Sequence, residues 1–143
     1  MLGTQDSSHR KDANLADVGT VDELNAPVVV EIMVRDLARS LDFYRRLGFR
    51  LERRTDRFAS LRWGTQYFFV AEDSALPPPA GPSRANLRLI VGDVDDEWQK
   101  VNGMGATVES GIADRPYGLR DFTILDPDGF GIRFASPTSR KRG

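Results

Sequence analysis

Three charged side chains interrupt strands that are otherwise apolar, and they are the groups in this chain best suited to chemistry. Glu31 lies within Val-Val-Val-Glu-Ile-Met-Val, Arg88 within Asn-Leu-Arg-Leu-Ile, and Arg133 within Gly-Ile-Arg-Phe-Ala. A carboxylate in such a place can act as a general base, and an arginine can bind an anion or stabilise an oxyanion. What they do depends on the face of the sheet that each one occupies.

Alternation along the strands predicts that face. If Ile132 and Phe134 point into a core, Arg133 points to the opposite face, because successive side chains of a strand alternate. The same alternation turns Glu31 and Arg88 away from the core. Further candidates for this ligand-binding face are Val29, Met33, Trp63, Phe68, Asn86 and Phe122. Arg62 is the alternative to Trp63, and Thr123 is the alternative to Phe122, because the alternation does not decide between neighbours in these two strands.

The elements that would position these residues follow the order strand, helix and three strands. The apolar run that begins near Pro27 ends at Asp36, a good helix N-cap, and Gly48 is placed to end the helix. The helix is predicted from the apolar stripe Leu37, Leu41, Tyr44 and Leu47. Three strands are predicted over residues 49–54, 58–63 and 66–72.

This pattern occurs twice. A shift of 57 positions carries Asp36 onto Asp93 and Gly48 onto Gly105, so a second helix is predicted between the latter two. The closing hairpins align at a shift of 65, which pairs Phe68 with Arg133. Asp-Pro-Asp-Gly at 126–129 predicts the tight turn of the second hairpin.

The domain organisation follows from this repeat. We predict a flexible tail over 1–26, a first βαβββ module over 27–74, a proline-rich linker over 75–84, a second module over 85–137 and a basic tail over 138–143. The fold class is α+β, in which two modules form curled mixed sheets, or half-barrels, each with a helix outside. One such small sheet cannot bury both of its faces, so the other faces must meet each other, a partner or a ligand.

Composition narrows the function classes. The 143 residues are 40% hydrophobic and 29% charged, with a formal net charge of −1 and no cysteine. The proportions of hydrophobic and charged residues are typical of a globular domain, and the small net charge predicts no nucleic-acid partner. The lack of cysteine excludes disulfides and thiolate metal sites. No apolar run reaches the roughly 20 residues of a membrane span. We therefore expect a cytoplasmic protein, without membrane or nucleic-acid partners.

Two motifs carry a resemblance to a known family. The first is Val-x-Asp-Leu-x-x-Ser-x-x-Phe-Tyr-x-x-Leu-Gly-Phe over 34–49, and the second is Asp-Pro-Asp-Gly over 126–129. With the repeat, they resemble the glyoxalase / bleomycin resistance protein / extradiol dioxygenase superfamily, also called vicinal oxygen chelate proteins. The resemblance implies a concave site, often completed by a second subunit, and hence a homodimer. It also implies that Tyr117, in the longer loop of the second half, lies over the mouth of the cleft.

In metal-dependent members of that superfamily, four inward positions usually carry histidine and glutamate. Mapped by the motifs, these positions are Val29, Phe68, Asn86 and Arg133 in this chain. Valine and phenylalanine have no donor atom, and arginine repels a divalent cation. The only histidine, His9, lies in the predicted tail. We therefore predict no metal ligands, no cofactor and neither glyoxalase nor dioxygenase activity.

Three functions are compatible with these observations. The first is a metal-free binding protein of the bleomycin-resistance type, which sequesters an antibiotic or aromatic metabolite in a cleft at a homodimer interface. The alternative is a lyase- or isomerase-type enzyme, in which Glu31 is the general base and Arg88 or Arg133 stabilises an oxyanion. The third is an interaction protein whose sheet faces serve only for dimerisation. Glu31 pairs with Arg88 or Arg133 in the chain itself, or these groups meet a charged ligand.

Overall fold

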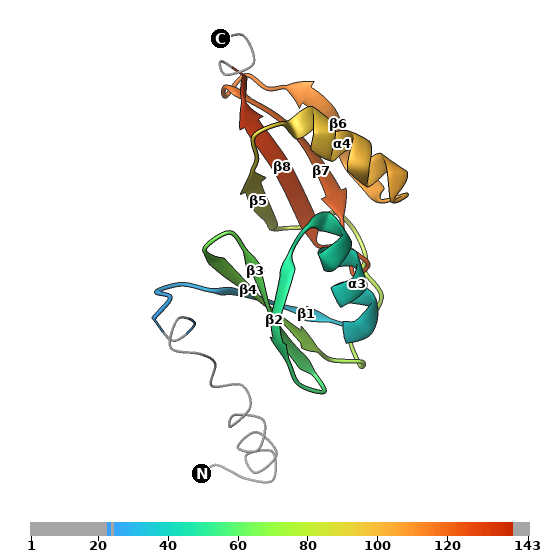
Figure 1. Cartoon of the computed structure of the whole chain (residues 1–143). Helices are drawn as coiled ribbons and strands as arrows, with labels where there is room; N and C mark the ends of the chain where they lie inside the picture. The colour runs from blue at the N-terminus through green and yellow to red at the C-terminus, as the bar shows by residue number, and fades with distance from the viewer. Residues whose placement is uncertain (1–22, 24, 139–143) are drawn as a thin grey trace. The chain divides into compact units, whose positions relative to one another are not determined.

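The computed structural model describes residue 23 and residues 25–138. The chain divides into two compact units, with the boundary between Leu76 and Pro77, and each unit is described by itself. The first unit contains β1 (Val30–Val34), α3 (Leu37–Leu47), β2 (Arg50–Arg54), β3 (Phe58–Trp63) and β4 (Gln66–Glu72). The second contains β5 (Asn86–Ile90), α4 (Val94–Gly103), β6 (Thr107–Asp114), β7 (Leu119–Leu125) and β8 (Gly131–Pro137) (Figure 1). The predicted βαβββ order is confirmed in both units.

Each unit forms one mixed, four-stranded sheet that does not close on itself. The strand orders are β1-β4-β3-β2 and β5-β8-β7-β6, with the first and last strands of each unit parallel and the other pairs antiparallel. A parallel pair requires a crossover connection, and the helix of each unit lies in it. The predicted α+β class is therefore confirmed.

Side chains at the helix ends explain where both helices begin and end. The Asp36 carboxylate accepts a hydrogen bond from the backbone N–H of Arg39 at 3.0 Å, and Asp93 caps α4 in the same way. Gly48 ends α3 with φ of 120°, a conformation that costs glycine little and other residues much more. The predicted N-caps Asp36 and Asp93 and the predicted end at Gly48 are confirmed, whereas α4 ends at Gly103 with Met104 as its C-cap, one residue before Gly105.

The core of each unit lies between its helix and one face of its sheet. In the first unit, the buried ring of Tyr44 meets Phe68 at a centroid distance of 5.2 Å and Phe49 at 5.4 Å. In the second, Phe122 stacks on Phe134 at 5.1 Å and contacts Trp98 of α4 at 4.9 Å. Burial of these aromatic side chains is the main stabilising contribution of each helix–sheet layer.

The turn between β7 and β8 is built as the sequence predicts. The N–H of Gly129 donates to the carbonyl oxygen of Asp126 at 2.9 Å, which closes the four-residue turn. Oδ1 of Asp126 also accepts from the backbone N–H groups of Asp128 and Phe130, at 2.8 and 2.9 Å. Asp126 therefore has a structural role in the turn, as expected.

Most of the two predicted tails lies outside the described residues, which omit 1–22, 24 and 139–143. Of the helices that are described, none is both long enough and apolar enough to cross a membrane.

Candidate functional site

The face of each sheet that its helix leaves uncovered is called the open face below. On the second sheet, four side chains stand in one row across the strands of this face. They come from β5, β8, β7 and β6 in that order, and strand pairing aligns them directly: Arg88, Arg133, Thr123 and Ser110. The prediction that Arg88 and Arg133 share the face opposite Ile132 and Phe134 is confirmed.

The two arginines of this row carry like charges on neighbouring strands. Paired strands lie about 4.8 Å apart, so the bases of the two side chains are close. Arg133 donates from Nε to Oγ1 of Thr123 at 3.0 Å, which fixes its position without neutralising it. Within the second unit, no described carboxylate forms an ion pair with either arginine. Asn86 lies on the same face, at the start of β5.

Tyr117 stands beside this pair on the loop between β6 and β7. The Cζ atom of Arg88 lies 6.0 Å from the centroid of its ring, within range of a cation–π contact. Its hydroxyl group donates to Oδ2 of Asp121 at 2.6 Å, and this hydrogen bond raises the pKa of Tyr117 above the usual tyrosine value. The side chain is 55% exposed, so one surface of the ring is available to a ligand.

Asp121 anchors the loop that carries Tyr117. Its side chain is only 2% exposed and accepts a hydrogen bond from Nε of Arg115 at 2.7 Å. Nη2 of the same arginine donates to Ser110 Oγ at 3.1 Å. Sequence reasoning missed this cluster, although one signal was available: Asp121 lies two residues before Thr123 in the same strand and therefore points to the same open face.

The first sheet carries a corresponding row on its open face. It crosses β1, β4, β3 and β2, and its members are Glu31, Phe69, Ser60 and Arg53. Glu31 is exposed and has no described ion-pair partner within the first unit. Met33 lies on the same face two residues later, and Val29 stands just before β1. A predicted ion pair from Glu31 to Arg88 or Arg133 would join the two units and stays a prediction.

The prediction that Phe68 lies on the ligand-binding face is wrong. It is buried against Tyr44 and Phe49 on the helix side, and its neighbour Phe69 pairs with Glu31 as Arg133 pairs with Arg88. The shift between the closing strands is therefore 64 and not 65. The turns before them differ in length, and an error of one residue moves every side chain to the other face.

Trp63 and Phe122 also lie on the helix side. The Trp63 ring is 5.0 Å from that of Phe49, and Phe122 packs on Trp98. Of the alternatives that the sequence left open, Arg62 and Thr123 are therefore the residues on the open faces. Arg62 lies over the ring of Tyr67, with 5.3 Å between its Cζ atom and the ring centroid.

The residues at the positions used by metal-dependent proteins of this fold do not fit a metal. With the corrected shift, these positions hold Val29, Phe69, Asn86 and Arg133. Only Asn86 offers an uncharged oxygen donor, whereas divalent metals need several anionic or imidazole ligands. Within the part of the chain that is described, no group of three His, Cys, Asp or Glu side chains is arranged to hold a metal ion.

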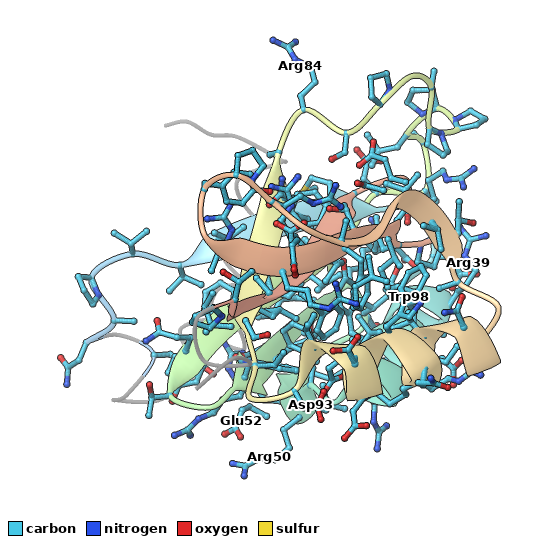
Figure 2. The ribbon with its side chains drawn as sticks, turned by 90° about the horizontal axis from the view of Figure 1, so that it is seen from above. Arg39, Arg50, Glu52, Arg84, Asp93 and Trp98 are labelled. Atoms are coloured by element: carbon cyan, nitrogen blue, oxygen red, sulfur yellow. The ribbon has the colours of Figure 1, made fainter. Side chains whose placement is uncertain are left out.

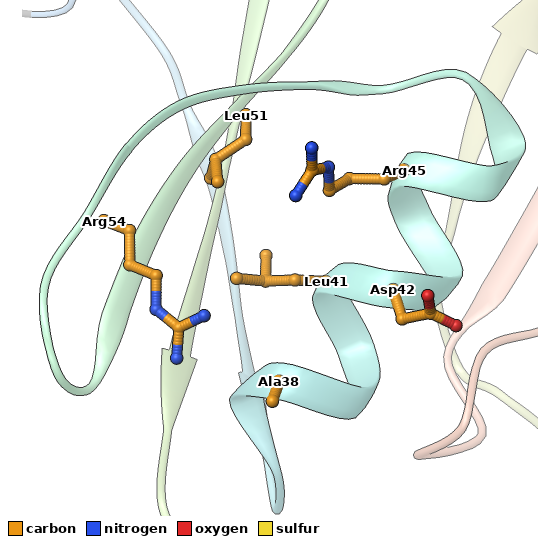
Figure 3. A pocket seen from close by; sticks show the side chains of 6 residues that line it. All are labelled: Ala38, Leu41, Asp42, Arg45, Leu51 and Arg54. Carbon is orange, nitrogen blue, oxygen red and sulfur yellow. The ribbon is translucent and has the colours of Figure 1, made fainter.

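A separate pocket of about 290 Å³ lies between α3 and β2. Figure 3 shows the side chains of Arg45 and Arg54 on opposite sides of Leu41. It is on the helix side of the first sheet and contains none of the row residues. The candidate residues of the open faces therefore lie outside this pocket.

A family model and many solved structures match this chain. The model described as Glyoxalase/Bleomycin resistance protein/Dioxygenase superfamily matches residues 26–134. The crystal structure of TioX from Micromonospora sp. ML1 is 27% identical, with a TM-score of 0.64, and the match covers 77% of this chain and 97% of that one. A comparison with curated proteins found no match.

Two further structures show the fold at lower identity. A glyoxalase/bleomycin resistance protein/dioxygenase from Alicyclobacillus acidocaldarius is 18% identical, with a TM-score of 0.68, covering 82% of this chain and 95% of that one. A bleomycin resistance determinant encoded on the transposon Tn5 is 21% identical, with a TM-score of 0.65, covering 80% and 99%.

Proposed function

The chain belongs to the glyoxalase/bleomycin resistance protein/dioxygenase superfamily, and on that premise we propose that it is a metal-free small-molecule binding protein of the bleomycin-resistance type. Its ligand is a planar compound with an anionic group, such as an aromatic metabolite or an antibiotic of that chemistry. The compound is held against the open face of the second sheet and is thereby sequestered, in a homodimer.

The observation that carries this proposal is the adjacency of Arg88 and Arg133 on the open face. Two guanidinium groups on neighbouring strands repel each other, and an anion between them removes that cost. Arginine also presents a planar set of donors that matches a carboxylate, sulfonate or phosphate. The exposed ring of Tyr117 beside Arg88 adds a surface on which an aromatic ligand can stack.

The choice of an anion departs from bleomycin itself, which is cationic. A cationic drug would meet two uncompensated arginines in the second unit, and this repulsion disfavours it. The proposal therefore concerns the type of protein, a binding protein that removes a compound from solution, and not that particular drug.

The homodimer is supported by apolar residues on the open faces. Met33 is 48% exposed and Ile90, which the repeat aligns with it, is 58% exposed. Large apolar side chains at matching exposed places mark surfaces that bind a ligand or another subunit. Light scattering coupled to size-exclusion chromatography tests this part, and a monomer at micromolar concentration would contradict it.

The metal-free part rests on the donor set of Val29, Phe69, Asn86 and Arg133. Elemental analysis of the purified protein is expected to find no divalent metal at stoichiometric amounts. One bound metal ion per chain would overturn this part while leaving anion binding to be judged by its own test.

Calorimetric titration tests the ligand class. The panel consists of aromatic carboxylates and sulfonates, their neutral amides, and bleomycin, and only the anions are expected to bind. Arg133→Gln and Arg88→Gln should each weaken binding by about 10- to 100-fold, the usual loss for a charge-assisted hydrogen bond. Arg84→Gln is the matched control, because Arg84 lies on the segment before β5, outside the strands of the second sheet, and its side chain points away from the ribbon (Figure 2). Equal affinity for anions and amides would contradict the proposal.

The enzyme alternative rests on Glu31. Its exposure on an open face, without a described partner in its unit, leaves it free to accept a proton from a substrate. Glu31→Gln separates the two functions once a bound compound is known. If the native protein turns the compound over and Glu31→Gln loses this turnover at unchanged affinity, the protein is an enzyme with Glu31 as its base. If the native protein shows no turnover, the binding function stands.

A further inference from the structure

Glu23 lies in the stretch for which the sequence predicts a flexible tail, yet its side chain is buried. Only 2% of that side chain is exposed, although it carries a charge. Oε1 accepts a hydrogen bond from Nε of Arg53 at 3.0 Å, and Oε2 accepts one from Oγ of Ser60 at 2.7 Å. Both carboxylate oxygens are therefore bound by groups of the sheet, as buried charge requires.

The groups that hold this carboxylate belong to the open face of the first sheet. Arg53 on β2 and Ser60 on β3 are direct neighbours in the strand pairing. The Cζ atom of Arg53 lies 5.1 Å from the ring centroid of Phe58, and that ring contacts Phe69 edge to face at 5.2 Å. A cation and a hydroxyl donor thus hold one carboxylate, and two aromatic rings in mutual contact lie next to the cation.

Among the described residues of the second unit, the corresponding positions make different contacts. Strand pairing aligns Ser60 with Thr123, because each pairs with the row residue of the closing strand of its unit, Phe69 or Arg133. In the second unit, however, the hydroxyl group of Thr123 accepts from Arg133, and Ser110 stands where the first unit has Arg53. Of the described residues, only Glu23 of the first unit places a carboxylate at these positions, and the buried carboxylate of the second unit, Asp121, is bound by Arg115 and Tyr117 instead.

We propose that Arg53 and Ser60 form a carboxylate-binding site in which Glu23 is an internal ligand. The external ligands of this site are monocarboxylates with an apolar body, which would place that body against Phe58 and Phe69. An internal ligand is present at high effective concentration, so such a compound binds the native chain weakly and only by displacing Glu23. This site lies on another sheet and uses other residues than the proposed anion site at Arg88 and Arg133.

Propionate is the probe that tests the site, because it carries the methylene and carboxylate that Glu23→Ala removes, with one further methyl group as its apolar body. The full-length variant is expected to melt at a lower temperature than the native chain, and propionate should restore much of the loss. A ligand of five non-hydrogen atoms should bind with a dissociation constant on the order of 1–10 mM. Propionamide, which lacks the charge, should have no effect.

Three further variants make the result specific. Glu23→Ala combined with Arg53→Gln should no longer respond to propionate. Glu23→Gln, which fills the same space, should be destabilised and equally unresponsive. Glu52→Ala is the control, since Glu52 pairs with Arg50 and Arg62 on the same sheet and not with Arg53, so its loss should create no propionate site at Arg53. If Glu23→Ala does not fold alone, the recovery of folded protein on addition of propionate, but not of propionamide, is the same test.

The outcomes divide cleanly. A propionate effect confined to Glu23→Ala and dependent on Arg53 supports the proposal. No effect on stability or on recovery of folded protein, an equal effect of propionamide, or an effect that persists without Arg53 would overturn it. Binding of aromatic anions at Arg88 and Arg133 is expected to be unchanged in Glu23→Ala, so the two proposals fail or succeed separately.

Discussion

Arg88 and Arg133 are direct neighbours on two parallel strands, and both point to the open face of the second sheet. Like charges opposite each other destabilise a sheet, and no described carboxylate of the second unit compensates them. Binding sites commonly retain such unfavourable contacts, because the ligand relieves them. The pair is thus a cost to the folded chain that a bound anion removes.

Replacing one member of the pair by an acid should therefore stabilise the protein while removing its function. Arg88→Glu places an opposite charge beside Arg133 and is expected to raise the free energy of unfolding by about 0.5–1 kcal/mol. Urea denaturation measures this change, and calorimetry should show that aromatic anions no longer bind. Arg84→Glu makes the same charge change outside the site and should alter neither quantity. A less stable Arg88→Glu protein would show that the two arginines do not repel each other.

The Arg115–Asp121 pair predicts an asymmetry between its two partners. Asp121 is almost fully buried, whereas Arg115 reaches solvent. Arg115→Met leaves a buried carboxylate without its cation and is expected to cost about 3 kcal/mol of unfolding free energy. Asp121→Asn removes the buried charge instead and should cost less. Equal losses in urea denaturation would show that burial of the carboxylate does not govern the pair.

The hydrogen bond from Tyr117 to Asp121 predicts a pH dependence. It raises the pKa of Tyr117, so the neutral phenol is favoured in the folded chain relative to the unfolded one. The stability that it contributes is present below about pH 10, the pKa of an unperturbed tyrosine, and is lost as the pH rises through the higher folded value.

The difference in unfolding free energy between the native chain and Tyr117→Phe should accordingly be constant near neutral pH and should shrink in alkali. Absorbance titration of the phenolate should show the pKa of Tyr117 falling toward the ordinary value in Asp121→Asn. A titration unaffected by that substitution would exclude the hydrogen bond as the cause.

Two adjacent phenylalanines predict opposite consequences of truncation. Phe68 is in the helix-side core of the first unit, and Phe68→Ala should cost about 3–5 kcal/mol of unfolding free energy. Phe69 lies on the open face and is only partly buried, so Phe69→Ala should cost clearly less. Urea denaturation of the two variants checks the shift of 64 between the closing strands. A larger loss for Phe69→Ala than for Phe68→Ala would support a shift of 65 instead.

The elements and the repeat could be predicted because their signals are local. Asp36, Asp93 and Gly48 sit at helix ends for reasons that lie within a few residues of each, and alternation alone placed Arg88 and Arg133 on the open face. Phe68 was misplaced because its side depends on the length of a turn, which the sequence does not measure.

The polar anchors of the site needed tertiary information. β6 changes register around Ser110, and such bulges carry no clear sequence pattern, so the meeting of Ser110 with Arg115 and Asp121 could not be derived. The carboxylate of Glu23 contacts Ser60, which lies 37 positions later in the sequence. Glu23 belongs to a polar segment without periodicity, so no local pattern predicts this contact. Only the folded sheet shows that its carboxylate has a place to bind.

The alignment of the two rows has a practical consequence for protein engineering. Each half gives the positions at which side chains can be grafted into the other half. The corresponding positions are Glu31 and Arg88, Ser60 and Thr123, and Phe69 and Arg133. Glu31→Arg together with Phe69→Arg would copy the cationic pair onto the first sheet. The chain thus holds a template and a recipient in one molecule, in which anion recognition can be transplanted and compared on the same scaffold.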